Sequence, residues 1–347
     1  MRTVLALIAV TLLPFQAQGP STSSGQGPRW TPLTTGVTAR LRGVSAASDR
    51  VVWASGANGT VIRTADGGET WQTLAIPGAE KLDFRDVDAI DERTAFALSI
   101  GPGEASRIYK TSDAGATWIE QFVNRDPDAF FDAMAFWDAN RGVAFSDSVD
   151  GRFVILTTSD GGKSWNRVAS TALPPALPNE GAFAASGTNV AVLPPGHVWI
   201  GTGAANEARV LRSSDGGRTW SVTKTPFAAG PSAGIFSIAF SDPRNGIVVG
   251  GDYKLEAVAS DNAAMTTDGG ATWTLIGGLS GFRSAVAYLS PATLIAVGPS
   301  GTDHSSDRGK TWTRVEGPGF HAFARSPQSQ TGYGVGEKGA AGKLIAR

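Results

Sequence analysis

Short apolar runs recur along the chain and are separated by Gly, Asp and Ser. One type of run opens with an aromatic or large aliphatic residue, at Leu41, Phe84, Phe130, Ile235 and Phe282. A second type ends in small residues and begins at Val51, Ala95, Gly142, His197, Gly246 and Leu294. No long stretch after residue 28 has the period of a helix. This pattern predicts an all-β protein built from many short strands.

An eight-residue phrase, Thr/Ser-x-Asp-x-Gly-x-Thr/Ser-Trp, occurs six times. Asp and Ser/Thr bond nearby backbone amides and Gly accepts positive φ, so the phrase predicts a tight turn between two strands. The Trp begins the second strand and is expected to anchor it in the core. The Asp is interpreted as a turn former; the alternative, a Ca²⁺ or substrate ligand, lacks the longer loop and closing Glu of an EF-hand. The repeated residues are Asp66, Asp113, Asp160, Asp215, Asp268 and Asp307, with Trp71, Trp118, Trp165, Trp220, Trp273 and Trp312.

The spacing of the phrase suits a propeller. Successive Asp residues are 47, 47, 55, 53 and 39 residues apart, a period typical of a four-stranded blade. Three further runs near the C-terminus, at Gly319, Gly332 and Gly342, lack the phrase, and residues 29–33 (RWTPL) match the strands that follow it elsewhere. The sequence therefore predicts a seven-bladed β-propeller of four-stranded blades, closed by pairing of the N-terminal strand with the C-terminal blade.

This phrase resembles that of Asp-box (BNR-repeat) propellers, and the resemblance covers the chain from residue 29. The unit VVWASGANGTVIRTADGGETWQTL is similar to the photosystem II assembly/stability factor family and its exported homologues in non-photosynthetic bacteria. That resemblance implies a seven-bladed propeller that assembles with other proteins. Sialidases and other secreted glycosidases carry the same box, so the box predicts architecture more strongly than function.

The N-terminus predicts export. Residues 1–19 resemble a signal peptide, with Arg2 before an apolar stretch from Val4 to Leu13. Residues 20–28 form a predicted flexible linker and residues 29–347 the propeller. We therefore expect a periplasmic or secreted monomer with no transmembrane segment after cleavage. With 30 Lys+Arg against 31 Asp+Glu and no basic run, nucleic acid is not an expected partner.

Candidate binding residues emerge when the blades are aligned. In an up-and-down blade, the starts of inner strands and the turns between second and third strands share the face opposite the phrase. The predicted ligand-binding residues on that face are Arg42, Arg85, Asp132, Asp147, Glu180, Asp252, Arg283 and His321. Aligned with them are Ser237 at an inner-strand start, and Pro299 and Glu337 at second-strand ends. Clustered arginines suit a carboxylate or phosphate, although a network of salt bridges between blades is an equal alternative.

Three functions remain open. The first is a non-catalytic interaction or assembly propeller that binds a protein or an anionic ligand at this face. The second is a sialidase-like glycoside hydrolase, with an Arg cluster for the substrate and Tyr253 as nucleophile beside Glu180 or Glu256, and Asp132 or Asp147 as the acid. The third is a module that binds an anionic glycan without turnover. No cofactor motif is visible, and the three histidines are too scattered to predict a metal site.

Overall fold

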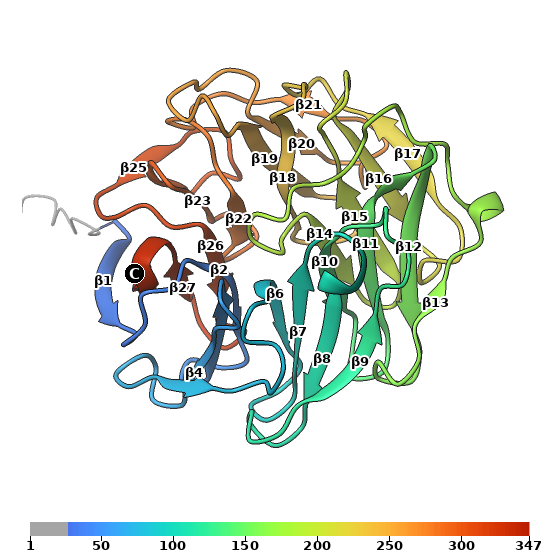
Figure 1. Ribbon diagram of the computed structural model, residues 1–347. Coiled ribbons are helices and arrows are strands. Elements are labelled where there is room, and N and C mark those ends of the chain that lie inside the picture. The colour runs from blue at the N-terminus through green and yellow to red at the C-terminus, as the bar shows by residue number, and fades with distance from the viewer. Residues whose placement is uncertain (1–26, 347) are drawn as a thin grey trace, which may run out of the picture.

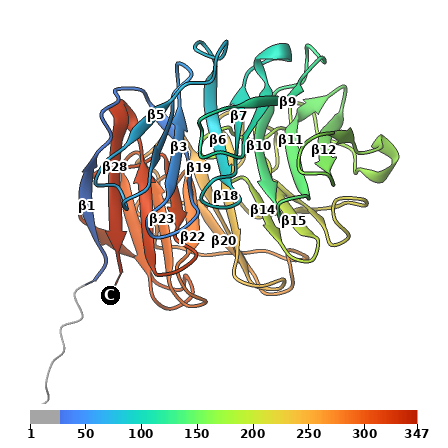
Figure 2. The ribbon, with the colours of Figure 1, turned by 90° about the horizontal axis from the view of Figure 1, so that it is seen from below.

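The computed structural model describes residues 27–346, whose strands form seven antiparallel sheets of four strands each. The sheets stand around a central axis as a disc-shaped ring (Figure 1), and Figure 2 shows the same disc from its edge. The inner strands of successive sheets contact each other in order, and the last contacts the first. The predicted seven-bladed propeller is confirmed. The predicted signal peptide and most of the predicted linker lie outside the described residues.

Each blade is a meander from the inner strand to the outer strand. Blade 1 contains β2 Leu41–Ala46, β3 Val52–Gly56, β4 Val61–Thr64 and β5 Gln72–Leu74. Blade 2 contains β6 Asp83–Ala89, β7 Ala95–Ile100, β8 Arg107–Thr111 and β9 Ile119–Val123. Blade 3 contains β10 Phe131–Phe136, β11 Gly142–Val149, β12 Arg152–Thr158 and β13 Asn166–Arg167. Blade 4, whose inner strand the sequence pattern did not define, contains β14 Val190–Leu193, β15 His197–Gly201, β16 Arg209–Ser213 and β17 Ser221–Lys224.

The remaining blades follow the same order. Blade 5 contains β18 Ala233–Phe240, β19 Gly246–Asp252, β20 Ala263–Thr266 and β21 Thr274–Leu275. Blade 6 contains β22 Ala285–Tyr288, β23 Leu294–Gly298, β24 Gly301–Ser305 and β25 Thr313–Val315. Blade 7 contains β26 Ala322–Arg325, β27 Thr331–Val335, β28 Ala340–Ile345 and β1 Arg29–Thr34. Three short 3₁₀ turns are η1 Gly103–Ala105, η2 Ser170–Ala172 and η3 Glu337–Gly339.

Blade 7 closes the ring with strands from both ends of the chain. Strand β1 pairs with β28 over six residues, from Arg29 opposite Ile345 to Thr34 opposite Ala340. Both views place β1 beside the C-terminal strand. The predicted closure is therefore confirmed. It removes a long free sheet edge, which would otherwise invite pairing with another chain.

The repeated phrase forms the turn between the third and fourth strands of blades 1 to 6. In blade 1 the hydroxyl of Thr64 donates to Asp66 Oδ1 at 2.7 Å, and the Thr70 amide and hydroxyl donate to the same carboxylate at 2.9 and 2.6 Å. The amide of Gly68, at φ +97°, donates to Thr64 Oγ1, and a Cβ there would lie 2.6 Å from Leu33. Each carboxylate is thus occupied within its own turn, as expected for a turn former.

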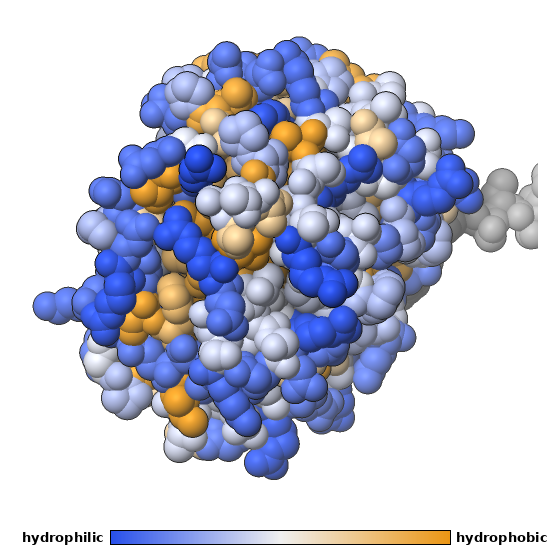
Figure 3. Space-filling view, turned by 90° about the vertical axis from the view of Figure 1, so that its right-hand side faces the viewer, coloured by the Kyte–Doolittle hydropathy of each residue, from blue (hydrophilic) through white to orange (hydrophobic). Residues whose placement is uncertain are grey.

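The Trp of each phrase packs at the junction between two blades. Trp118, for example, meets Trp53 of the preceding blade edge-on with ring centroids 6.1 Å apart. Most buried apolar residues form clusters that two neighbouring blades share. From the side that carries β13 and β17, the surface is mainly hydrophilic with smaller apolar areas (Figure 3). Within residues 27–346, no helix has the length and apolar character needed to span a membrane.

The turn carboxylates should make stability depend on acidity. Hydrogen bonds from Thr117 and Ser164 lower the pKa values of Asp113 and Asp160 to about 2. A folded pKa below the unfolded value stabilises the native state above about pH 4, and this contribution is lost as the pH falls towards 2. We expect the melting temperature of the double variant Asp113→Asn/Asp160→Asn to fall less than that of the wild type over this window, measured by circular dichroism.

Replacement of Glu69, an exposed carboxylate in the first turn, by Gln provides the control for charge removal alone. Its melting curve should follow that of the wild type at each pH. Parallel curves for the wild type and the double variant would show that these turns contribute nothing to the acid dependence.

Candidate functional site

A cavity of about 520 Å³ opens on the face opposite the repeated turns. Its walls come from the starts of inner strands and from the segments that follow second strands, the two places predicted to share a face. Five of the eight predicted ligand-binding residues line it. The charged and titratable lining residues are Arg40, Arg42, Arg85, Asp132, Asp147, Tyr253, Glu256, His321 and Glu337.

Bulges direct four side chains into this cavity. The pairing of the first and second strands shifts by one residue at Arg42, Arg85, Asp132 and Phe236. Such a shift leaves one residue unpaired and turns its side chain away from the regular alternation. The residue before each of them, such as Leu41 or Phe84, is fully buried between blades. One local backbone feature therefore repeats around the ring and supplies the site with three charged side chains and one aromatic side chain.

One arginine of the basic wall has no carboxylate partner in the part of the chain that the structure describes. Arg40 pairs with Glu337 at 2.8 Å, and Arg85 pairs with Asp83 at 2.9 Å. Arg42 makes no ion pair, and its buried Nε atom has no hydrogen-bond partner among the described residues. Its one hydrogen bond, from Nη1 to Ala185 O, is 3.5 Å long. Burial, followed by the charges of Arg85 and Arg40, lowers the pKa of Arg42 to about 10, which leaves it protonated at neutral pH.

His321 occupies the same wall in a neutral form. Its Nε2 atom lies 2.8 Å from Glu337 Oε1, while Nδ1 is buried and has no hydrogen-bond partner within residues 27–346. Burial and the neighbouring charge of Arg42 lower its pKa to about 4. The imidazole is therefore uncharged at neutral pH, and it adds a polar ring atom to the wall without adding a positive charge.

The floor is the segment from Ala182 to Thr188, which crosses the central opening before β14 begins. Ala184 O accepts from Arg85 of blade 2 at 3.0 Å, and Ser186 Oγ donates to Ser284 O of blade 6 at 2.8 Å. Thr188 Oγ1 donates to Ser237 Oγ of blade 5 at 2.7 Å. Contacts to blades on opposite sides of the ring fix this segment as a bridge. It belongs to the long Pro-rich connection between β13 and β14.

An acidic pair and an aromatic wall complete the cavity. Asp132 and Asp147 are neighbours, and burial raises the pKa of both. The arginines of the cavity form the basic wall, and the two aspartates form a second, acidic feature of the same cavity. The aromatic wall contains Phe183 stacked on Phe236, with centroids 4.0 Å apart, and Tyr253 lies about 6 Å from both rings.

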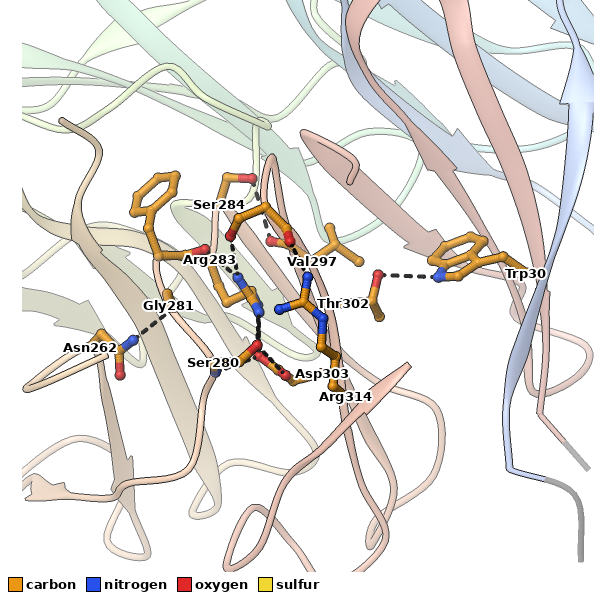
Figure 4. Close-up of polar contacts among 12 residues, drawn as sticks. Trp30, Asn262, Ser280, Gly281, Arg283, Ser284, Val297, Thr302, Asp303 and Arg314 are labelled. Atoms are coloured by element: carbon orange, nitrogen blue, oxygen red, sulfur yellow. Dashed lines mark hydrogen bonds and ion pairs between the residues drawn. The ribbon is translucent and has the colours of Figure 1, made fainter. Parts of the chain in front are cut away.

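The structure places Arg283 away from the cavity, contrary to the alignment that grouped it with Arg42 and Arg85. Its side chain, which precedes β22, is fully buried and bonds Asp303 of β24, with Nε 2.8 Å from Oδ2 (Figure 4). In blade 6, Ala285 pairs with Val297 as Gly43 pairs with Ser55 in blade 1. Ser284 is therefore the counterpart of Arg42, and Arg283 takes the buried position of Leu41. The alignment was one residue out, which exchanges the two faces of a strand.

Glu180 and Asp252 also lie outside the cavity lining. Glu180 is buried and accepts from Thr202 Oγ1 at 2.7 Å and from Arg209 Nε at 2.9 Å. These bonds attach the Pro-rich connection to blade 4. Asp252 accepts from the Lys254 amide at 2.9 Å and shapes the loop that carries Tyr253. The glycosidase hypothesis placed Tyr253 beside Glu180 or Glu256; of these two carboxylates, Glu256 lines the cavity with Tyr253 and Glu180 does not.

Sequence reasoning missed several lining residues. Arg40 lies two positions before Arg42 at a strand start, and the alternation of a strand would have placed both on one side. Phe236 was missed because the alignment chose Ser237, again one residue out. Phe183 had no signal of its own, because its position follows from the path of the floor segment.

These features define a seven-bladed β-propeller with a charged cavity over a bridged central opening. Among solved structures the chain is similar to "YCF48 bound to D1 peptide", with a TM-score of 0.67 and 17% identity, covering 92% of this chain and 97% of that one. "YCF48 from Cyanidioschyzon merolae" gives 0.67 and 18%, covering 91% and 98%. The RRP9 WD40 repeats give 0.64 and 11%, covering 93% and 99%.

At these identities the likeness establishes a shared fold. The predicted resemblance is confirmed at the level of the fold, by the structural similarity to YCF48. No family model and no curated protein gave a significant match to the sequence.

Proposed function

We propose that this protein is an exported, non-catalytic interaction propeller that binds an acidic group of a partner protein in the cavity. The observation that carries the proposal is Arg42, a largely buried guanidinium with no carboxylate within ion-pair distance among residues 27–346. A buried cation is costly unless it is paired. Its neighbours Arg40 and Arg85 each have an internal partner, so Arg42 is the group that a carboxylate would complete.

Two further features support a protein as the partner. The loop after β19 raises Tyr253, Leu255 and Val258 into solvent beside the cavity, and all three are exposed. Exposed apolar residues next to a charged cavity are typical of a protein-binding surface. The similar structure of YCF48 was solved with a D1 peptide bound. Export rests on the signal peptide predicted over residues 1–19.

Replacement of Arg42 by Gln should weaken binding of an acidic peptide about tenfold or more. A hydrogen bond to a charged group contributes about 1.5–3 kcal/mol, and 1.4 kcal/mol corresponds to tenfold in affinity. The probe is a fluorescent, N-acetylated pentapeptide of alternating Glu and Leu with a free carboxyl terminus. Its dissociation constant is measured by fluorescence anisotropy at low and at physiological ionic strength.

Arg218→Gln provides the matched control, because Arg218 is exposed in a repeated turn on the opposite face. It removes the same charge and should leave affinity within about twofold. Equal affinities of wild type and Arg42→Gln would reject the cavity as the binding site. Tighter binding of sialyllactose than of the peptide would favour a glycan ligand, and release of free sialic acid would favour the glycosidase.

A further inference from the structure

The cavity contains an acidic pair, Asp132 and Asp147. Asp132 is 1% exposed, and its Oδ2 atom has no hydrogen-bond partner among the described residues. Neither Asp132 nor Asp147 takes part in an ion pair within residues 27–346. Both side chains line the cavity, and Asp132 is directed there by the bulge at the start of β10. Burial raises the pKa of both carboxyl groups, and the neighbouring charge of Asp147 raises that of Asp132 further.

The other buried carboxylates near this face are treated differently. Glu180 is bonded to Arg209, and Asp303 is bonded to Arg283. Each of those pairs is closed to solvent and holds two segments together. Asp132 and Asp147 instead face open volume, with Arg85 held by Asp83 and by Ala184 O. Asp86 is also buried without an arginine, but it accepts from the Met134 amide and does not line the cavity. The unpartnered Oδ2 atom of Asp132 belongs to a side chain that does line the cavity, and it therefore points to a ligand.

The floor segment places this pair close to the basic wall. Asp147 Oδ1 accepts from the Ala182 amide at 2.9 Å, while Ala184 O accepts from Arg85. Three residues of extended chain span at most about 10 Å. One ligand of modest length can therefore reach both groups.

We propose that Asp132 and Asp147 form a cation subsite that takes an ammonium group of the same ligand whose carboxylate meets Arg42. An ammonium suits the pair because it offers three donors to carboxylate oxygens. Among residues 27–346 no group of three acidic or His side chains is placed to hold a metal ion. The inference rests on the proposed function and adds that the recognised segment is bipolar, with a lysine side chain or a free amino terminus near its acidic group.

The test compares two small probes on the full-length protein. N-acetyl-lysine carries a carboxylate and an ammonium, and N-acetyl-norleucine has the same carboxylate and a similar chain without the ammonium. Affinities are measured by saturation-transfer NMR titration. We expect N-acetyl-lysine to bind the wild type at least about tenfold more tightly, and we expect Asp132→Asn and Asp147→Asn each to reduce this preference to about twofold or less.

Asp128→Asn is the matched control, since Asp128 is an exposed carboxylate in the connection that leads into β10 and does not line the cavity. It should keep the preference for N-acetyl-lysine. The tripeptide Gly-Gly-norleucine, with a free amino terminus, distinguishes the two sources of the ammonium: tighter binding than that of N-acetyl-lysine assigns the subsite to an amino terminus, and weaker binding assigns it to a lysine side chain.

Equal affinities of N-acetyl-lysine and N-acetyl-norleucine for the wild type would overturn the cation subsite. A preference that survives in both Asn variants would overturn it as well. The proposed function is tested separately, because Arg42→Gln should weaken both probes. If the two probes bind the wild type equally well and both lose affinity in Arg42→Gln, the anion site is supported and the cation subsite is rejected. If neither probe binds, both proposals are overturned.

Discussion

Replacement of Asp303 by Ala should lower the free energy of unfolding by about 3–5 kcal/mol, because it leaves a buried guanidinium without its counter-charge. Arg283 is fully buried and Asp303 is 1% exposed. The carboxylate accepts from Arg283 Nε at 2.8 Å and from the amide and hydroxyl of Ser280 at 3.0 and 2.8 Å (Figure 4). All of these donors lose their acceptor at once. The loss is measured by urea unfolding followed through tryptophan fluorescence.

Two controls separate burial from the mere removal of a charge. Glu207→Gln breaks an exposed pair with Lys224 and should cost less than about 1 kcal/mol. The double variant Arg283→Met/Asp303→Leu removes both charges and should recover most of the stability that Asp303→Ala loses, because a buried pair can often be replaced by apolar residues. A loss below about 1 kcal/mol in Asp303→Ala would contradict the description of a closed, fully desolvated pair.

The blades were predictable because their determinants are local. The repeated phrase needs only eight consecutive residues to form its turn, and all six copies form it with the same hydrogen bonds. The closure by residues 29–33 followed from their likeness to the other outer strands. The face of the candidate site followed from up-and-down topology alone, since every second connection of a meander lies on the same side.

The individual side chains of the site were less predictable because a bulge changes the register by one residue. The dipeptides Phe84-Arg85 and Phe282-Arg283 are identical in sequence. In blade 2 the arginine is the bulged residue that faces the cavity, whereas in blade 6 that position belongs to Ser284. The partner that keeps Arg283 buried, Asp303, is twenty positions away in another strand. Local sequence does not reveal such a partner, and the period of two then assigns the wrong face.

The floor of the cavity shows a second limit. The length and Pro content of the connection before β14 can be read from the sequence, but its path across the central opening depends on contacts with several blades at once. Glu180 was placed at the site because its loop reaches that face. A carboxylate is a suitable group for a binding site, but the carboxylate of Glu180 is bonded by Arg209 of β16. Such a pairing joins segments that are distant in the sequence, so it becomes visible only in the folded ring.

Replacement of Trp30 by Ala should lower the free energy of unfolding by about 3–5 kcal/mol and weaken the closure of the ring. Trp30 is the buried residue of β1, with its ring 4.4 Å from Phe320 and 6.0 Å from Phe323. Its Nε1 donates to Thr302 Oγ1 of blade 6 at 3.1 Å. It therefore attaches the N-terminal strand to two blades. Urea unfolding measures the loss, and limited proteolysis should cut the variant first near β1.

A cross-link can distinguish loss of closure from loss of packing. Thr31 lies opposite Lys343 in the β1–β28 ladder, and Cα atoms of such pairs are about 4.5–5.5 Å apart, within the reach of a disulfide. The chain has no cysteine, so Thr31→Cys/Lys343→Cys introduces a unique pair. In the Trp30→Ala background, the oxidised form should regain resistance to proteolysis near β1, whereas the reduced form should not. If both forms were cut equally fast, Trp30 would contribute to packing alone and the hydrogen bonds of the ladder would be sufficient to close the ring.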